Sequence, residues 1–141
     1  MKIVMGSDHA GFELKEHVRK YLLEKGVEVE DQGAYSLESV DYPDFAKKVS
    51  EAVLEQGILG ILICGTGIGI SIAANRHRGI RAALCENEFS ARMSRAHNNA
   101  NILCMGGRVV GIGVAESIVD AFLSTEFEGG RHARRVEKIE R

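Results

Sequence analysis

A cysteine followed by three alternating glycines is the stretch of this sequence with the clearest chemical potential. Residues 64–75 read CGTGIGISIAAN, and the segment 69–76 is expected to be helical. Glycines allow tight turns in which successive backbone N–H groups point to one side, at the positive end of a helix. Such a group of amides binds a phosphate or stabilises an oxyanion that forms during a reaction.

The glycine spacing does not fit the common nucleotide-binding motifs. The dinucleotide fingerprint is G-x-G-x-x-G after the first strand, whereas Gly65, Gly67 and Gly69 follow the third expected strand as G-x-G-x-G. The sequence also lacks G-x-x-x-x-G-K-[ST]. Nucleotide binding is therefore disfavoured, while phosphate binding and oxyanion stabilisation both stay open.

Two side chains of this loop are candidates for chemistry. Cys64 directly precedes a helix N-terminus, which favours a thiolate that could act as a base or a nucleophile, but free cysteine is also a common core residue. Thr66 could donate a hydrogen bond into the same site or cap the helix. The sequence leaves both choices open. Cys85 and Cys104 lie in apolar runs and are expected to be buried thiols.

Acid–base and cationic side chains stand at the ends of other elements. Asp8 and His9 follow the first expected strand, and His97 ends a helix, so caps and surface imidazoles are the alternatives to catalytic roles. Arg131 and Arg135 are four residues apart, which places both on one face of a helix where they could bind a phosphate or form a solvated basic tail. Together these groups suit proton transfer on a small phosphorylated molecule, and no motif such as H-E-x-x-H indicates a metal.

The elements that must position these residues are strands alternating with helices. Five β-rich runs are expected at 2–6, 27–31, 60–65, 80–84 and 101–107. Three apolar stripes at helical spacing lie between or after them: Leu14, Val18, Tyr21 and Leu22; Phe45, Val49, Ala52 and Val53; Val114, Ile118, Ala121 and Phe122. Right-handed crossovers then give a parallel sheet with helices on both faces, a doubly wound α/β fold.

Ligands of such sheets bind beyond the carboxyl ends of the strands. The segments there are 7–11, 64–69, 85–88 and 106–108, and the last adds a third cation, Arg108. The longest irregular stretch is 32–44, in which Pro43 and Asp44 resemble the first turn of a helix. The segment 129–141 begins with two glycines, is expected to form a short helix, and carries five cations against two carboxylates.

Length and composition indicate one globular domain over residues 1–141. The net charge is −2, so no strong field points to nucleic acid or a membrane surface. Three cysteines without C-x-x-C spacing, and no long apolar run, predict a soluble cytoplasmic protein with reduced thiols. We expect no cofactor.

Five segments, in order, resemble the type B ribose-5-phosphate isomerases, a family that includes galactose-6-phosphate and allose-6-phosphate isomerases. They are GSDHAGFELK at 6–15, DYPDFA at 41–46, ILICGTGIGISIAANR at 61–76, ARMSRAHNNANILCMGGRV at 91–109 and FEGGRHARRV at 127–136. The resemblance implies a Rossmann-like three-layer αβα sandwich with a five-stranded parallel sheet and a C-terminal helical tail. It also implies a homodimer with shared active sites, and leaves a dimer of dimers open.

The resemblance assigns the reaction to the glycine loop. Cys64 would be the base that removes the proton next to the carbonyl, supported by Thr66. Some relatives use a loop glutamate instead, but Ile70 stands at that position, so this chain resembles the cysteine subtype. The enediolate would be held by backbone amides of residues 65–70, which as substrate-binding residues are Gly65, Gly67, Ile68, Gly69 and Ile70.

The remaining roles also come from the resemblance. His97 would open the sugar ring with Asp8 nearby, Asn98 would bind sugar oxygens, and Tyr42 would line the pocket. The phosphate would be bound by His9, Arg131 and Arg135. His97, Asn98 and Arg108 are expected to reach the site from the partner chain.

The expected activity is interconversion of ribose 5-phosphate and ribulose 5-phosphate through a cis-enediolate, without a metal. The nearest alternative is isomerisation of allose 6-phosphate or galactose 6-phosphate in a roomier pocket. A non-catalytic nucleotide-binding sensor module, in which Cys64 is dispensable, is the alternative from a different class.

Overall fold

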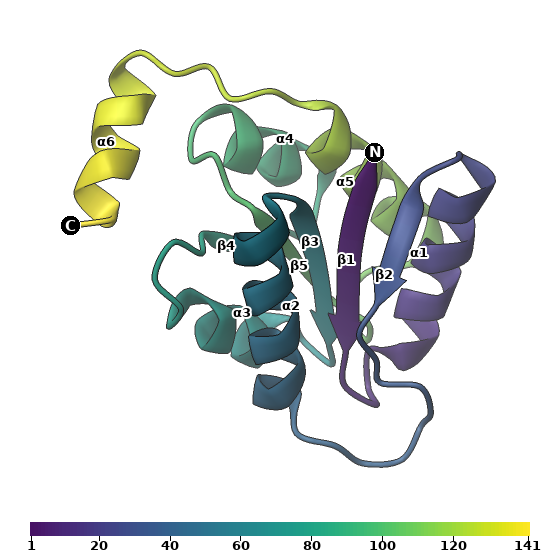
Figure 1. Ribbon diagram of the computed structural model, residues 1–141. Coiled ribbons are helices and arrows are strands. Elements are labelled where there is room, and N and C mark those ends of the chain that lie inside the picture. Colours follow the sequence, from purple (N-terminus) through teal and green to yellow (C-terminus); the bar gives the residue numbers. More distant parts are fainter.

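A parallel sheet forms the centre of the computed structural model, which describes residues 1–141 (Figure 1). Its order is β2-β1-β3-β5-β4, and all four pairings are parallel. The strands are β1 Lys2–Ser7, β2 Glu28–Asp31, β3 Leu59–Cys64, β4 Ala82–Leu84 and β5 Ile102–Gly106. The strand order reverses between β1 and β3, so the carboxyl ends of these two strands flank the switch point at which doubly wound sheets bind ligands.

Six helices accompany the sheet, and five of them cover its two faces. They are α1 Phe12–Glu24, α2 Tyr42–Gln56, α3 Ile68–Asn75, α4 Glu88–Ala96, α5 Ile112–Ser124 and α6 Arg131–Ile139. Alternate strand residues point to opposite faces: Ile61 and Ile63 pack with α1, α4 and α5, whereas Leu62 and Cys64 pack with α2 and α3. The expected three-layer αβα sandwich is confirmed.

One residue of the expected apolar stripes does not lie on a buried face. Val114 on α5 has 49% of its surface exposed, whereas Ala115 beside it is fully buried. The buried face of α5 runs through Ala115, Ile118, Val119 and Phe122, and Val114 lies one residue, about 100°, away from it. Spacing alone placed Val114 in the stripe, and spacing does not distinguish two adjacent stripes of an apolar helix.

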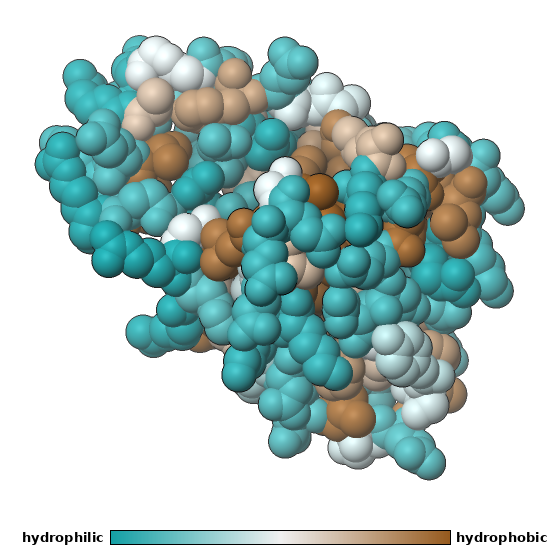
Figure 2. Space-filling view, in the orientation of Figure 1, coloured by the Kyte–Doolittle hydropathy of each residue, from teal (hydrophilic) through white to brown (hydrophobic).

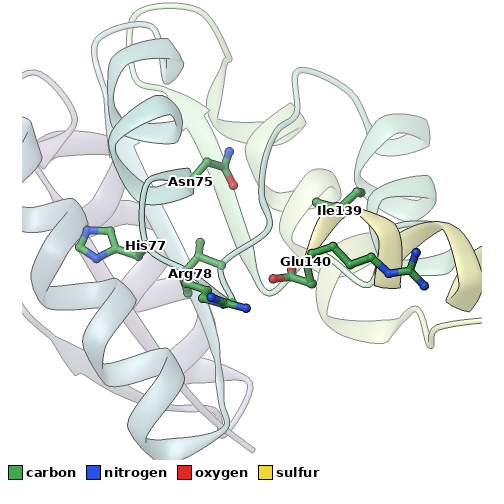
Figure 3. Close-up of a pocket in the computed structure, with 8 residues that line it drawn as sticks. Asn75, His77, Arg78, Ile139 and Glu140 are labelled. Atoms are coloured by element: carbon green, nitrogen blue, oxygen red, sulfur yellow. The ribbon is translucent and has the colours of Figure 1, made fainter.

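The last helix, α6, stands apart from the sandwich (Figure 1). None of its residues is buried. Its C-terminal end is held by an ion pair between Arg81 and Glu140, next to a pocket of about 240 Å³ that Asn75, Arg78 and Ile139 help to line (Figure 3). The helix expected from the two glycines is confirmed, but it does not contribute to the core.

The surface is mainly hydrophilic, with separate hydrophobic patches (Figure 2). Ile68 and Ile72, four residues apart on α3, are 51% and 56% exposed. No helix combines the length and the apolar character that crossing a membrane requires.

Candidate active site

A cleft of about 430 Å³ opens at the carboxyl edge of the sheet, at the switch point. It is lined by Asp8, His9, Ala10, Tyr42, Cys64, Gly65, Thr66, Ile68, Gly69 and Arg108. Except for Ala10, these are all residues that the sequence singled out. The loops after β1, β3 and β5 supply most of them, because parallel strands bring their carboxyl ends to one edge.

Cys64 is the last residue of β3, and it is both a core residue and a cleft residue. Only 5% of its surface is exposed, yet its side chain lines the cleft. The backbone N–H of Gly67 donates a hydrogen bond to Cys64 Sγ over 3.2 Å. This bond directs a backbone donor at the sulfur, next to the start of α3.

The glycine loop leaves several amides free to bind an anion. The backbone N–H groups of Gly65, Gly69 and Ile70 donate to no group of the protein, while that of Ile68 donates to Thr66 Oγ1 over 3.2 Å. Ile70 contributes only its backbone, because its side chain is fully buried. Thr66 thus accepts a hydrogen bond from a backbone amide at the helix start and also lines the cleft, and its donation of a hydrogen bond into the site stays a prediction.

Gly67 is required by its surroundings, and Gly69 lies against a tyrosine side chain. Gly67 has a φ of +80°, and a Cβ there would lie 2.8 Å from the backbone carbon of Met105. A Cβ on Gly69 would lie 2.6 Å from Cζ of Tyr42, so the tyrosine ring packs directly on this backbone. Tyr42 thus covers the start of α3 and helps to enclose the cleft.

Asp8 and His9 are held in the cleft by local hydrogen bonds. The Asp8 carboxylate is buried and accepts a hydrogen bond from the Gly11 amide over 3.0 Å, so it caps the turn before α1 while it lines the cleft. His9 Nδ1 accepts from the Val40 amide over 3.2 Å. In the neutral ring this leaves the proton on Nε2, which can donate to a bound anion.

Arg108 lies in the cleft of its own chain, so the expectation that it comes from the partner is wrong. The Arg108 amide donates to the Gly65 carbonyl over 3.0 Å, and the Gly107 amide donates to the Cys64 carbonyl over 2.8 Å. These bonds tie the loop after β5 to the glycine loop, because β5 is the sheet neighbour of β3. A Cβ on Gly65 would lie 3.6 Å from an Arg108 guanidinium nitrogen.

The other predicted residues lie at the amino ends of the strands, opposite the cleft. His97 follows α4 and precedes β5, and Asn98 beside it faces a separate pocket of about 350 Å³. Arg131 and Arg135 lie on α6 and form no ion pair or hydrogen bond within the chain. A five-residue strand such as β5 is about 17 Å long, so His97 and Cys64 of one chain do not meet.

Two residues that the sequence analysis missed join His97. The His97 and His132 rings stack with centroids 4.1 Å apart, and Glu128 Oε1 lies 3.9 Å from His97 Nε2 and 3.6 Å from His132 Nε2. The Glu128 amide also donates to the Ala96 carbonyl. The spacing of Glu128 and His132, four residues apart, was the only sequence signal for this cluster.

The two other cysteines are unsuited to chemistry. Cys104 is fully buried, which raises the pKa of its thiol well above the ordinary value. Burial also raises the pKa of Cys85. The expectation that both are core thiols is confirmed, and Cys64 is the one cysteine that reaches the cleft.

The sequence profile of the Ribose/Galactose Isomerase family matches residues 3–139. This chain belongs to that family. Ribose-5-phosphate isomerase B of Escherichia coli (strain K12) is 53% identical over 139 residues, which span 98% of this chain and 93% of that protein.

Solved structures agree with this membership of the Ribose/Galactose Isomerase family. Ribose-5-phosphate isomerase B of Clostridium thermocellum is 58% identical and superposes with a TM-score of 0.98, covering 99% of this chain and 95% of that one. A ribose 5-phosphate isomerase of Thermotoga maritima is 63% identical with a TM-score of 0.97, covering 99% and 97%. The Rossmann-like fold and the resemblance seen in the sequence are confirmed.

Proposed function

We propose that this chain, as one domain over residues 1–141, interconverts ribose 5-phosphate and ribulose 5-phosphate through a cis-enediolate, with Cys64 as the base. The observation that carries the proposal is the Cys64 thiol in the cleft, bonded to the Gly67 amide and surrounded by free amides. The relatives from Escherichia coli and Clostridium thermocellum, which are ribose-5-phosphate isomerases by name, support the choice of substrate.

The proton transfer follows from the position of Cys64. Its thiolate removes the proton from C2 of the open-chain aldose, which leaves the negative charge of the enediolate on the C1 oxygen. The proton of the C2 hydroxyl then passes to the C1 oxygen, and the Cys64 thiol returns a proton to C1, which gives the ketose and regenerates the thiolate. The same sulfur serves both steps because C1 and C2 are adjacent atoms of the substrate. A positioned base of this kind contributes about 10² to 10⁴ to the rate.

The amides at the start of α3 stabilise the intermediate. Negative charge develops on the carbonyl oxygen only as the enediolate forms, so fixed N–H donors bind the transition state better than the substrate. Gly65, Gly69 and Ile70 offer amides without a partner in the protein. Arg108 adds a positive charge to the same cleft.

A second copy of the chain completes the site in this proposal. His97 and Asn98, the proposed ring-opening and sugar-binding residues, and the proposed phosphate ligands Arg131 and Arg135 lie at the sheet edge remote from Cys64. A twofold homodimer would place this group of one copy at the cleft of the other and so create two equal sites. The exposed Ile68 and Ile72, beside the cleft, suit such an interface.

The second candidate substrate is a six-carbon aldose phosphate, because the matching family is described by both ribose and galactose. The cleft also contains no feature that resembles a nucleotide motif, which leaves the sensor module without support. Buried, unpaired cysteines fit a reducing compartment, so we place the reaction in the cytoplasm.

The test is proton NMR of chelator-treated protein with ribose 5-phosphate in deuterated water. We expect ribulose 5-phosphate with one deuterium at C1, because solvent exchanges with the Cys64 proton before it is returned. Product without deuterium would indicate hydride transfer and overturn the enediolate. Turnover of allose 6-phosphate or galactose 6-phosphate in preference to ribose 5-phosphate would overturn the substrate assignment.

Substitution of the proposed base gives the matching prediction. Cys64→Ala should lower kcat by at least about 100-fold while binding of the sugar phosphate persists, because only the proton acceptor is lost. Cys85→Ala is the control, since that thiol is buried outside the cleft and its loss should leave kcat unchanged. Turnover of the Cys64→Ala enzyme at the wild-type rate would contradict the assignment.

A further inference from the structure

Three metal-ligating side chains converge at the amino edge of the sheet, away from the cleft of the same chain. His97, Glu128 and His132 each offer one ligand atom, and all of these atoms lie within 4.8 Å of one another. Glu128 Oε1 is 3.9 Å from His97 Nε2 and 3.6 Å from His132 Nε2. The three residues come from the end of α4, the connection after α5 and the first turn of α6.

These separations are close to those of a coordinated ion. Two ligands bound at about 2.1 Å to a tetrahedral centre lie roughly 3.4 Å apart. The two Glu128 separations exceed this by a few tenths of an ångström. The two imidazole rings are stacked, with planes within 8° of parallel, so both rings must turn out of the stack before their lone pairs reach one ion. Glu128 is free to follow, because 58% of its side chain is exposed.

The donor set suits a transition metal. Two of the three proposed ligands are imidazoles, which bind ions such as Zn²⁺ readily, whereas Mg²⁺ prefers oxygen ligands. Arg131 and Arg135 lie on the same helix as His132, so a cation held by charge alone is disfavoured there.

We propose that His97, Glu128 and His132 form a binding site for one divalent transition-metal ion of the Zn²⁺ or Co²⁺ type, with the fourth position open to solvent. On the basis of the proposed function, in which His97 opens the sugar ring, an ion on His97 Nε2 occupies the lone pair that moves the proton. Metal binding at this cluster therefore inhibits isomerisation, and zinc acts as a reversible regulator of the enzyme.

Cobalt absorption tests the site without any reference to activity. Chelator-treated protein titrated with Co²⁺ should develop the visible d–d bands of tetrahedral cobalt at one ion per chain, and excess Mg²⁺ should not remove them. Glu128→Gln and His132→Gln should each weaken binding by about 100-fold or more. His77→Gln, which removes a histidine outside the cluster, should leave it unchanged.

Three results of the titration would overturn the site. They are binding at no defined stoichiometry, equal cobalt affinity in the Glu128→Gln and wild-type proteins, and a near-ultraviolet sulfur-to-cobalt charge-transfer band, which would identify Cys64 as the ligand. Because Glu128 is an exposed residue, its glutamine variant is expected to fold normally.

Inhibition tests the regulatory step. Zinc at a concentration that saturates the site should inhibit the wild-type isomerase at least about tenfold. It should leave Glu128→Gln at the activity that this variant has without metal. Zinc binding without inhibition would overturn the regulatory role. If the chelated protein isomerises no sugar phosphate at all, the proposed function fails, while the cobalt titration still decides the metal site.

Discussion

Gly67 links the backbone of the cleft to the thiol of Cys64. Its amide donates to Cys64 Sγ, its φ is +80°, and an added Cβ would lie 2.8 and 2.9 Å from the backbone carbon and oxygen of Met105. Because backbone atoms of a central strand cannot move aside, Gly67→Ala must displace the amide. We expect kcat to fall by about 10² to 10³ and stability to fall by at least about 1 kcal/mol, measured by steady-state kinetics and denaturant unfolding.

Gly57→Ala is the matched control for this substitution. Gly57 also has a positive φ, +66°, but an added Cβ would meet nothing within 4 Å, and the residue ends α2 far from the cleft. It should lose about 1 kcal/mol of stability through the backbone alone and keep full activity. Equal kcat values for the Gly67→Ala and Gly57→Ala proteins would show that the Gly67 amide has no part in catalysis.

At the scale of single residues, the sequence predicted which residues line the cleft. It did not predict which chain supplies Arg108 or which residues contact His97. Cys64, Asp8 and Arg108 follow strands, and parallel strands necessarily end at one edge, so their proximity could be expected. The prediction that Arg108 comes from the partner chain was wrong. The position of Arg108 depends on which strand pairs with β3, and that pairing is not local in the sequence. Glu128 and His132 were missed because their contact with His97 spans more than thirty residues of chain and depends on where α6 docks.

At the scale of elements, a charged network joins α1 to β2. Lys15 is fully buried and donates to both oxygens of Asp31 over 2.7 and 2.8 Å and to Glu16 over 3.2 Å. Arg19 donates to Glu16 over 2.8 and 3.0 Å. A buried ammonium group without these carboxylates would be strongly unfavourable, so the network fixes α1 over the edge of the sheet.

This network makes stability depend on pH. The hydrogen bond from Arg19, together with Lys15, lowers the pKa of Glu16 to about 2. Because the folded-state pKa is below the ordinary 4.5, the ionised carboxylate stabilises the fold at neutral pH, and this contribution disappears as the pH falls from about 4.5 to about 2. Glu16→Gln should therefore cost about 1 kcal/mol at pH 7, allowing for solvent screening, and much less near pH 2.

Urea unfolding of the two proteins across this pH range measures the difference directly. Glu24→Gln on the exposed end of α1, where the carboxylate has no hydrogen-bond or ion-pair partner, should follow the wild type at every pH. A gap between Glu16→Gln and wild type that stays constant from pH 7 to pH 2 would mean that Glu16 acts through packing and not through its charge.

The elements themselves were largely predictable, and the exceptions have two causes. Five β-rich runs located the strands, and apolar residues at helical spacing located α1, α2 and α5, because each of these helices buries one stripe. The periodicity misplaced Val114, since adjacent stripes of an apolar helix look alike. It gave no strand order, and it could not show that α6 leaves the sandwich, because both depend on contacts between distant segments.

At the scale of the whole molecule, one chain carries two separate groups of proposed site residues, one at each end of the strands of its sheet. The cleft holds Cys64 and Asp8. His97 follows α4 and the two arginines lie on α6, the helix that stands apart from the sandwich (Figure 1). In a twofold dimer the same contact forms twice, so the His97 group of each copy can lie against the cleft of the other. Each active site would then combine the cleft of one copy with the His97 group of its partner. The proposed isomerase is then active only as a dimer.

Mixed dimers test this arrangement. Cys64→Ala and His97→Gln chains, each nearly inactive alone, should form heterodimers in which one site has both native residues and the other has neither. Random assembly makes about half of the dimers mixed, so about a quarter of the wild-type activity should return when the two chains are co-expressed. Pairing Cys64→Ala with Asp8→Asn is the control, because both residues belong to one cleft and no native site can form. Heterodimers of the first pair that remain as inactive as the second would show that His97 acts within its own chain or not at all.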